Sequence, residues 1–256
     1  MTNNSDPKKE SLAEIAIDPE VLAKELAFEL EIDPLEQIDS ENFSKGNLNI
    51  TSECNEALKL LKGNREQRIQ GLRIFCEYRD KRSFPFLLPL LDQPCPVERM
   101  SAVYALGRNP CPSAVQKLVS LLETDDNAYV RRATAWSLAN YDNQIVLKPL
   151  INALKNDVAA VRLWSSSSLA EIGNVSLENA QLAAEQLLIS LKIDNEPGVR
   201  SNCIWSMCRL YEKLDNTFQE SFVDECTKIA LFDKQPSVME EAKTALDSMG
   251  MQGFYN

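Results

Sequence analysis

Apolar and polar residues along most of this chain recur with the period of an α-helix, and the pattern itself returns at regular intervals. Six segments carry a small residue three positions after their start and a large apolar residue seven positions after it; they start at Arg68, Arg99, Arg131, Arg162, Arg200 and Met239. At 100° per residue these two positions lie about 40° apart around a helix, so they form one narrow stripe. The spacing predicts six helices that bury this stripe and pack closely against their neighbours.

A second apolar run follows each of the first five segments. These runs read FLLPLLD, KLVSLLE, PLINALKND, QLLISLKID and CTKIALFD, and successive first segments start 31, 32, 31, 38 and 39 residues apart. Two helices of about 12 residues with short loops fill such a period. A pair of this size cannot bury its apolar faces alone and must stack on the next pair. The sequence therefore predicts an all-α, superhelical solenoid of stacked α-α pairs.

The segment before the repeats is acidic. Residues 1–45 hold twelve Asp or Glu and four Lys, a net charge of −8, within a chain whose net charge is −11. Residues 19–31, PEVLAKELAFELE, predict a short helix with three leucines on one ridge and Asp18 as its cap. We expect this acidic helix to act as a docking element, either folding back reversibly onto the solenoid or engaging a partner.

The domain organisation follows from these two patterns. We assign residues 1–47 to an acidic N-terminal extension with one amphipathic helix and residues 251–256 to a tail. Residues 48–250 form the predicted solenoid, with about five repeats plus end caps.

Composition excludes several classes of enzyme. The chain has no histidine and eight glycines, so Ser-His-Asp triads, Cys-His pairs, histidine zinc sites and glycine-rich phosphate loops are excluded. The acidic net charge disfavours nucleic acid and anionic lipid as partners. The conspicuous apolar stretch at residues 84–91 is too short to span a bilayer and contains two prolines. The sequence predicts a soluble protein with no membrane insertion. It contains no convincing catalytic constellation, which favours a non-enzymatic role.

The first helices carry a resemblance to a known family. They read RMSAVYALG, RRATAWSLA, RLWSSSSLA and RSNCIWSMC, and this pattern resembles the HEAT-like repeats of the cyanobacterial phycobilin lyase family over residues 64–250. LRIFCEYRD, RMSAVYALGRNP and AAVRLWSSSSLAEIG are most similar to the HEAT-repeat partner of an IscA-type iron–sulfur assembly protein. The resemblance implies a HEAT-like α-α superhelical solenoid that acts as a scaffold or chaperone in iron–sulfur cluster handling. The alternative that it implies is a bilin lyase, or a lyase subunit, acting on a cysteine of a phycobiliprotein.

Aromatic residues are the candidate anchors for a partner protein. Tyr104, Trp136 and Trp205 lie five positions after the arginine of their helices, and Trp164 lies two positions after its arginine. The helical period places all four on the outward side, opposite the buried stripe. Tyr and Trp are favoured anchors of protein interfaces. The alternative is that neighbouring first helices cover these rings by lateral packing.

The arginines that open the first helices are predicted to be structural. Arg99, Arg131, Arg162 and Arg200 each follow an aspartate by five to seven residues, at Asp92, Asp125, Asp157 and Asp194. We expect an Asp–Arg ladder that bridges the turns between repeats and fixes their register through bidentate pairs. The alternative is that the arginines hold the propionates of a bilin.

Seven cysteines without short spacings predict reduced thiols in a cytoplasmic protein. Cys95 and Cys111 each lie in a Pro-Cys-Pro turn, but a helix separates them by about 18 Å, so they cannot share a metal ion. We therefore predict no metal site and no cofactor of the chain's own. Under the family resemblance, one turn cysteine would contact a cluster held mainly by an IscA-type partner, and Asp142 beside Tyr141 would contact a bilin bound for a phycobiliprotein.

Overall fold

The computed structural model describes residues 43–251, and every regular element in that range is helical. The α-helices are α2 (Phe43–Leu60), α3 (Arg65–Glu77), α4 (Phe84–Leu87), α5 (Pro96–Arg108), α6 (Val115–Thr124), α7 (Ala128–Leu138), α8 (Leu147–Asn156), α9 (Ala159–Gly173), α10 (Leu177–Ile193), α11 (Pro197–Leu210), α12 (Asn216–Phe232) and α13 (Pro236–Ser248). Short 3-10 helices are η2 (Lys81–Ser83), η3 (Leu88–Asp92), η4 (Pro112–Ala114), η5 (Gln144–Val146) and η6 (Tyr211–Lys213). The predicted all-α fold class is confirmed.

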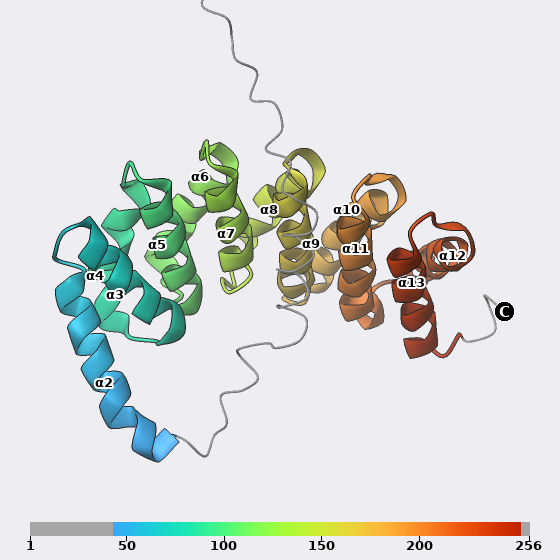
Figure 1. Ribbon diagram of the computed structural model, residues 1–256. Helices are drawn as coiled ribbons and strands as arrows, with labels where there is room; N and C mark the ends of the chain where they lie inside the picture. Colours follow the sequence, from blue (N-terminus) through green and yellow to red (C-terminus); the bar gives the residue numbers. More distant parts are fainter. Residues whose placement is uncertain (1–42, 252–256) are drawn as a thin grey trace, which may run out of the picture. The chain divides into compact units, whose positions relative to one another are not determined.

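Residues from Thr51 onward form one compact unit, in which the helices lie in two layers. The first helices α3, α5, α7, α9, α11 and α13 pack side by side in chain order, and α6, α8, α10 and α12 form the second layer (Figure 1). Each second helix also packs on the first helix that follows it. This is the stacked arrangement of helix pairs that the repeat predicts.

The predicted stripe lies in the core between the layers. Buried positions three residues after each start are Gly71, Ala102, Thr134, Ser165, Cys203 and Ala242, and those seven residues after it are Phe75, Leu106, Leu138, Leu169, Met207 and Leu246. The need for a small residue is clearest at Gly71, where an added Cβ would lie 2.9 Å from the carbonyl oxygen of Ala57. The small residues let neighbouring helices approach, and the large residues fill the space between them.

Local sequence signals set the helix starts. Asn64 caps α3 in a reciprocal capping box with Gln67, and Asn127 and Ser176 accept hydrogen bonds from the first-turn amides of α7 and α10. The helices α5, α11 and α13 instead begin with a proline, whose fixed φ suits the first turn. Different caps therefore start equivalent helices at equivalent places in the repeat.

The N-terminal predictions are only partly within the described range. The predicted helix at residues 19–31 and its docking lie outside the residues that the structure describes. Helix α2 already begins at Phe43, so the predicted boundary between residues 47 and 48 falls inside a helix. Between residues 43 and 251, no helix combines the length and apolar character needed to cross a bilayer.

The substitution Ala102→Leu tests the small-residue rule. Ala102 is fully buried in α5, so the added side chain must displace a neighbouring helix, and we expect a loss of about 1–3 kcal/mol in unfolding free energy. Urea denaturation followed by circular dichroism measures it. Lys148→Leu adds bulk at an exposed position of α8 and is the control, with an expected change within about 0.5 kcal/mol. Equal stability of the two variants would contradict the close helix approach.

Candidate functional site

An ion pair joins each repeat to the next along one edge of the solenoid. In the pairs Arg99–Asp125, Arg131–Asp157, Arg162–Asp194 and Arg200–Asp233, the arginine Nε and Nη2 donate to the two carboxylate oxygens at 2.7 to 3.2 Å. Arg68 makes the corresponding contact with Glu98 at 2.7 Å. Bidentate, charge-assisted pairs of this kind fix both distance and orientation. We call this series the ladder.

The expected carboxylate partners of the ladder were wrong. The spacing predicted that each arginine pairs with the aspartate before it, whereas the carboxylate comes from the aspartate that ends the next second helix. The preceding turn contributes main-chain carbonyls instead: Nη1 of Arg131 donates to Asp125 at 2.8 Å and Nη1 of Arg200 to Asp194 at 2.9 Å. For Arg131, Arg162 and Arg200 the preceding aspartate is unavailable because the arginine of the previous repeat already holds its carboxylate. Asp92, which precedes Arg99, pairs with Lys117 instead.

The ladder arginines have little surface left for another ligand. Their side chains are 13 to 24% exposed, and every guanidinium donates both to a carboxylate and to a main-chain carbonyl. Hydrogen bonds to the aspartates raise the pKa of Arg99, Arg131 and Arg162. These side chains therefore stay charged and paired, and their surroundings leave little room for a bilin propionate.

The four aromatic candidates do not form one exposed stripe. Tyr104 and Trp136 lie on neighbouring first helices with ring centroids 5.3 Å apart, and both are half-buried. Trp164 is also half-buried, whereas Trp205 is 40% exposed. The guanidinium of Arg209 lies 5.0 Å from the ring centroid of Trp205. Lateral packing thus covers most of the surface of the first three rings, and Trp205 is the one that a partner can reach most readily.

Two of the ligand candidates meet inside the protein. The Tyr141 hydroxyl donates to the carbonyl of Leu106 at 3.0 Å and accepts from the Cys111 amide at 3.4 Å. Tyr141 is 4% exposed and Cys111 is 5% exposed, and burial raises the pKa of Tyr141 to about 12. A surface ligand has no access to either side chain. Asp142, next to them, is exposed.

Cys95 occupies a different environment from Cys111. It is half-buried at the start of α5, and Nη2 of Arg65 lies 2.9 Å from its sulfur. Within residues 43–251, no three His, Cys, Asp or Glu side chains are grouped to hold a metal ion. Cys95 is therefore the turn cysteine that a group carried by a partner can approach.

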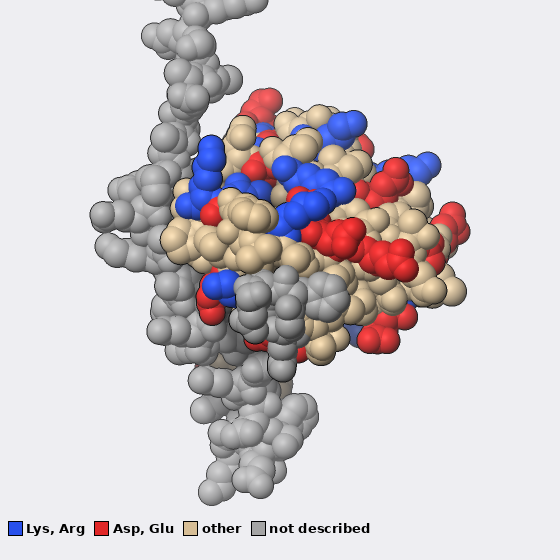
Figure 2. Space-filling view, turned by 90° about the vertical axis from the view of Figure 1, so that its right-hand side faces the viewer, with Lys and Arg blue, Asp and Glu red and all other residues tan. Residues whose placement is uncertain are grey.

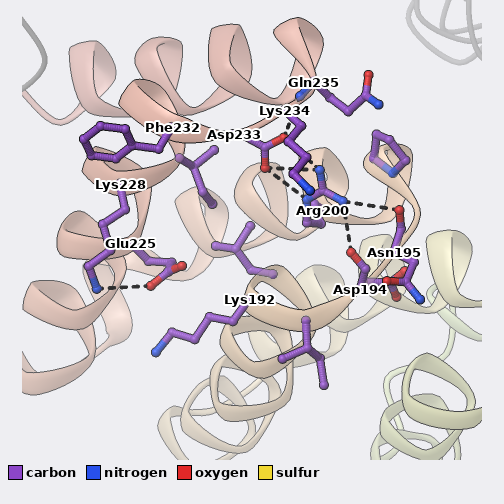
Figure 3. A pocket seen from close by; sticks show the side chains of 14 residues that line it. Lys192, Asp194, Asn195, Arg200, Glu225, Lys228, Phe232, Asp233, Lys234 and Gln235 are labelled. Atoms are coloured by element: carbon purple, nitrogen blue, oxygen red, sulfur yellow. Dashed lines mark hydrogen bonds and ion pairs between the residues drawn. The ribbon is translucent and has the colours of Figure 1, made fainter.

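The C-terminal end of the solenoid carries a surface that the sequence analysis missed. Seen from the side of α12 and α13, several Lys and Arg side chains lie close together, with Asp and Glu side chains and uncharged surface beside them (Figure 2). On the ladder edge of the same repeats, a hollow of about 520 Å³ opens between the ends of α10 and α12 and the starts of α11 and α13 (Figure 3). The Arg200–Asp233 pair lies in this hollow, which we call the C-terminal hollow.

Two large apolar side chains border the C-terminal hollow and face solvent. Phe232, the last residue of α12, is 78% exposed, and Ile193, the last residue of α10, is 72% exposed. Each immediately precedes a ladder aspartate. Aligning the second helices on these aspartates would have found both residues, but the first-helix alignment does not include them.

An equivalent hollow two repeats earlier has a different lining. It measures about 420 Å³ and contains the Arg131–Asp157 pair. The residue before the ladder aspartate is Asn156 there, where α12 has Phe232, and Asn152 lies one turn earlier, where α12 has Lys228. The hollow thus recurs with the repeat. Val158 lines the earlier hollow and is 46% exposed, whereas large apolar residues before the ladder aspartates belong to the C-terminal repeats.

Comparison with known proteins agrees with this architecture. The family model described as HEAT repeats matches residues 55–139 and 115–208. An engineered protein is 20% identical with a TM-score of 0.55, covering 76% of this chain and 98% of its own. A designed armadillo repeat protein is 19% identical with a TM-score of 0.53, covering 78% and 99%.

A third similar structure belongs to a much longer protein. A chain of the Kap95:Nup1 complex is 15% identical with a TM-score of 0.57, and the match covers 91% of this chain and 33% of that one. No curated protein matches this chain. At these identities the structural matches establish the fold and leave the partner open.

Substituting a ladder arginine tests what the ladder contributes to stability. Arg131→Met leaves the largely buried Asp157 carboxylate without its guanidinium, so we expect a loss on the order of 3 kcal/mol in urea denaturation. Lys59→Met removes the exposed pair with Glu56 and should cost no more than about 1 kcal/mol. If Arg131→Met and Lys59→Met lost the same unfolding free energy, the ladder would not be a main source of stability. The double variant Arg131→Met/Asp157→Leu should recover part of the loss.

Alkylation tests the different environments of the cysteines. Native protein treated with iodoacetamide at pH 8 should be modified first at Cys95, which is partly accessible. Burial raises the pKa of Cys76 to about 12 and that of Cys208 to about 11, so few of these thiols are in the reactive thiolate form. Peptide mass spectrometry gives the order. Modification of the buried Cys111 as fast as Cys95 would contradict its placement in the core.

Proposed function

The chain belongs to the HEAT-repeat family, and from this premise we propose that it is a non-catalytic scaffold or chaperone that binds another protein. Stacked helical repeats present long, continuous surfaces, and they need no acid–base side chain to do so. One of the structures with this fold is a complex, Kap95:Nup1, so the fold is compatible with binding a partner.

The observation that carries this proposal is the apolar border of the C-terminal hollow. Phe232 and Ile193 are 78% and 72% exposed, although they flank a hollow whose floor is fixed by the ladder. Large apolar side chains grouped on an otherwise polar surface mark interaction sites. The second surface that we propose includes Trp205, with Tyr104, Trp136 and Trp164 as supporting contacts from the first helices.

The family resemblance supplies a finer hypothesis about the partner. We propose an IscA-type iron–sulfur assembly protein, with the cluster held mainly by that partner and approached by Cys95. The seven cysteines have free thiols, which supports our expectation that the protein acts in the cytoplasm. Reconstitution of an IscA-type partner with iron and sulfide, with and without this chain, tests whether the chain changes cluster absorbance.

The alternative function is that of a bilin lyase or lyase subunit. Its support is weaker because Tyr141 is buried and the ladder arginines are already paired. Titration with phycocyanobilin distinguishes the two functions. A saturable, red-shifted absorbance band that is lost when the exposed Asp142 is substituted would favour the lyase over the scaffold.

Affinity capture from the native cell tests the scaffold function. The tagged full chain should enrich at least one protein reproducibly, and Phe232→Ser/Ile193→Ser or Trp205→Ala should reduce its yield about 10-fold, because interface anchors carry most of the binding energy. Quantitative mass spectrometry measures the yield. Asn156→Ser, at the position equivalent to Phe232 in α8, is the matched control and should leave the yield unchanged. Enrichment of no protein above the tag alone would contradict the scaffold function.

A further inference from the structure

The apolar border of the C-terminal hollow is not needed by the fold. Phe232 and Ile193 contribute little to the core because most of their surface is exposed, and the adjacent Ile189 and Leu231 are each 42% exposed. In the equivalent hollow over Arg131, the residues before the ladder aspartates are the polar Thr124 and Asn156. The same repeat therefore folds with polar side chains at these positions. The apolar side chains at the C-terminal end need an explanation outside the fold, and contact with a binding partner provides one.

The exposed charged side chains that line the hollow are lysines. Lys192, Lys228 and Lys234 line it and are exposed, and Lys228 has one contact, with Glu225 at 3.5 Å (Figure 3). Among the residues that the structure describes, no carboxylate pairs with Lys192 or Lys234. These ammonium groups are available to a ligand.

The three carboxylates that line the hollow are largely hidden from solvent, whereas Glu196 beside the lining is exposed. Asp194 is held by Arg162 and its side chain is 6% exposed, whereas Asp233 is held by Arg200 and is 11% exposed. The side chain of Glu225 is 15% exposed. An approaching ligand therefore meets three lysines before it meets these acids, although the chain as a whole is acidic. An acidic partner complements this local charge, and a basic one does not.

We infer that the C-terminal hollow binds an acidic segment of another protein that carries large apolar side chains. The apolar side chains would contact Phe232 and Ile193, and the segment's carboxylates would pair with the three lysines. A volume of about 520 Å³ suits a few side chains of a short segment rather than a folded domain. This inference rests on the proposed scaffold function and specifies the class of partner.

Fluorescence anisotropy with the full chain tests the inference. The probe is a short fluorescein-labelled peptide of glutamate, leucine and phenylalanine; two reference peptides replace every glutamate by lysine, or every leucine and phenylalanine by serine. We expect the first peptide to bind in a salt-sensitive way and both references to bind at least about 10-fold more weakly. Phe232→Ser should weaken the first peptide about 10-fold, since it removes the most exposed apolar contact.

Reversing the charge of the three lysines distinguishes a loss of peptide recognition from a loss of folded structure. The variant Lys192→Glu/Lys228→Glu/Lys234→Glu should lose the acidic peptide and gain the lysine peptide, which a misfolded chain would not do. Two matched changes near the hollow over Arg131 should leave binding unchanged: Asn156→Ser in its lining, and Lys155→Glu at the position two residues before the ladder aspartate that Lys192 has in α10. Equal binding of the acidic and basic peptides, or equal loss in the matched variants, would overturn the inference.

The same assay tests whether the chain's own acidic segment occupies the hollow. Binding that appears only after Leu22, Leu26 and Leu30 are changed to serine would show that residues 19–31 occupy the hollow, and the inference of a separate protein would then be wrong. Failure of the peptide to bind, while affinity capture still recovers partners, would overturn this inference and leave the scaffold function standing. Failure of both experiments would overturn both.

Discussion

The rest of the structure depends on the ion pair that joins each repeat to the next. Each ladder arginine links three parts of the chain. It belongs to a first helix, and its guanidinium donates to the turn before that helix and to the aspartate that ends the following second helix. Because the arginine and aspartate side chains are largely buried, removing one partner leaves a charge with little solvation. The pairs therefore fix where each second helix ends relative to the next repeat. This fixes the geometry of the edge on which the hollows lie.

Hydrogen bonds between first helices add a second constraint on register. The side chain of Asn109 donates to the carbonyl of Phe75 at 2.8 Å, Ser168 donates to Ala135 at 2.8 Å, and Ser206 donates to Ser166 at 2.9 Å. These donors are buried, so a shift of one helix past another would leave them unsatisfied. In the serine-rich stretch of α9, the Ser168 hydroxyl and the Ser166 carbonyl make these contacts, whereas the buried Ser165 hydroxyl has no hydrogen-bond partner. The apolar stripe and these polar contacts thus specify the same stacking of the first helices.

The sequence was sufficient to predict the fold because each repeat shows the same helical pattern. Contacts between repeats were harder to predict. The buried stripe from Phe75 to Leu246 follows from helical period alone. Period identifies Arg131 as recurrent, but it cannot say that its carboxylate partner lies 26 residues later, at the end of the next helix. A single-helix projection placed Tyr104 and Trp136 outward; it contains no neighbour, so it could not show that the two rings lie 5.3 Å apart. Phe232 and Ile193 were missed because the first-helix alignment does not include the second-helix ends where they lie.

Stability and recognition use different residues in this chain. The ladder and the stripe recur in nearly every repeat, whereas the residue before the ladder aspartate changes from Thr124 and Asn156 to Ile193 and Phe232 without altering the fold. A position that the fold does not constrain can take the chemistry that a partner requires, because changing it costs little folding free energy. The absence of histidine fits the same division. Binding through apolar contact and lysine charge needs no group that titrates near neutral pH, so a scaffold can recognise its partner with the side chains that this edge already presents.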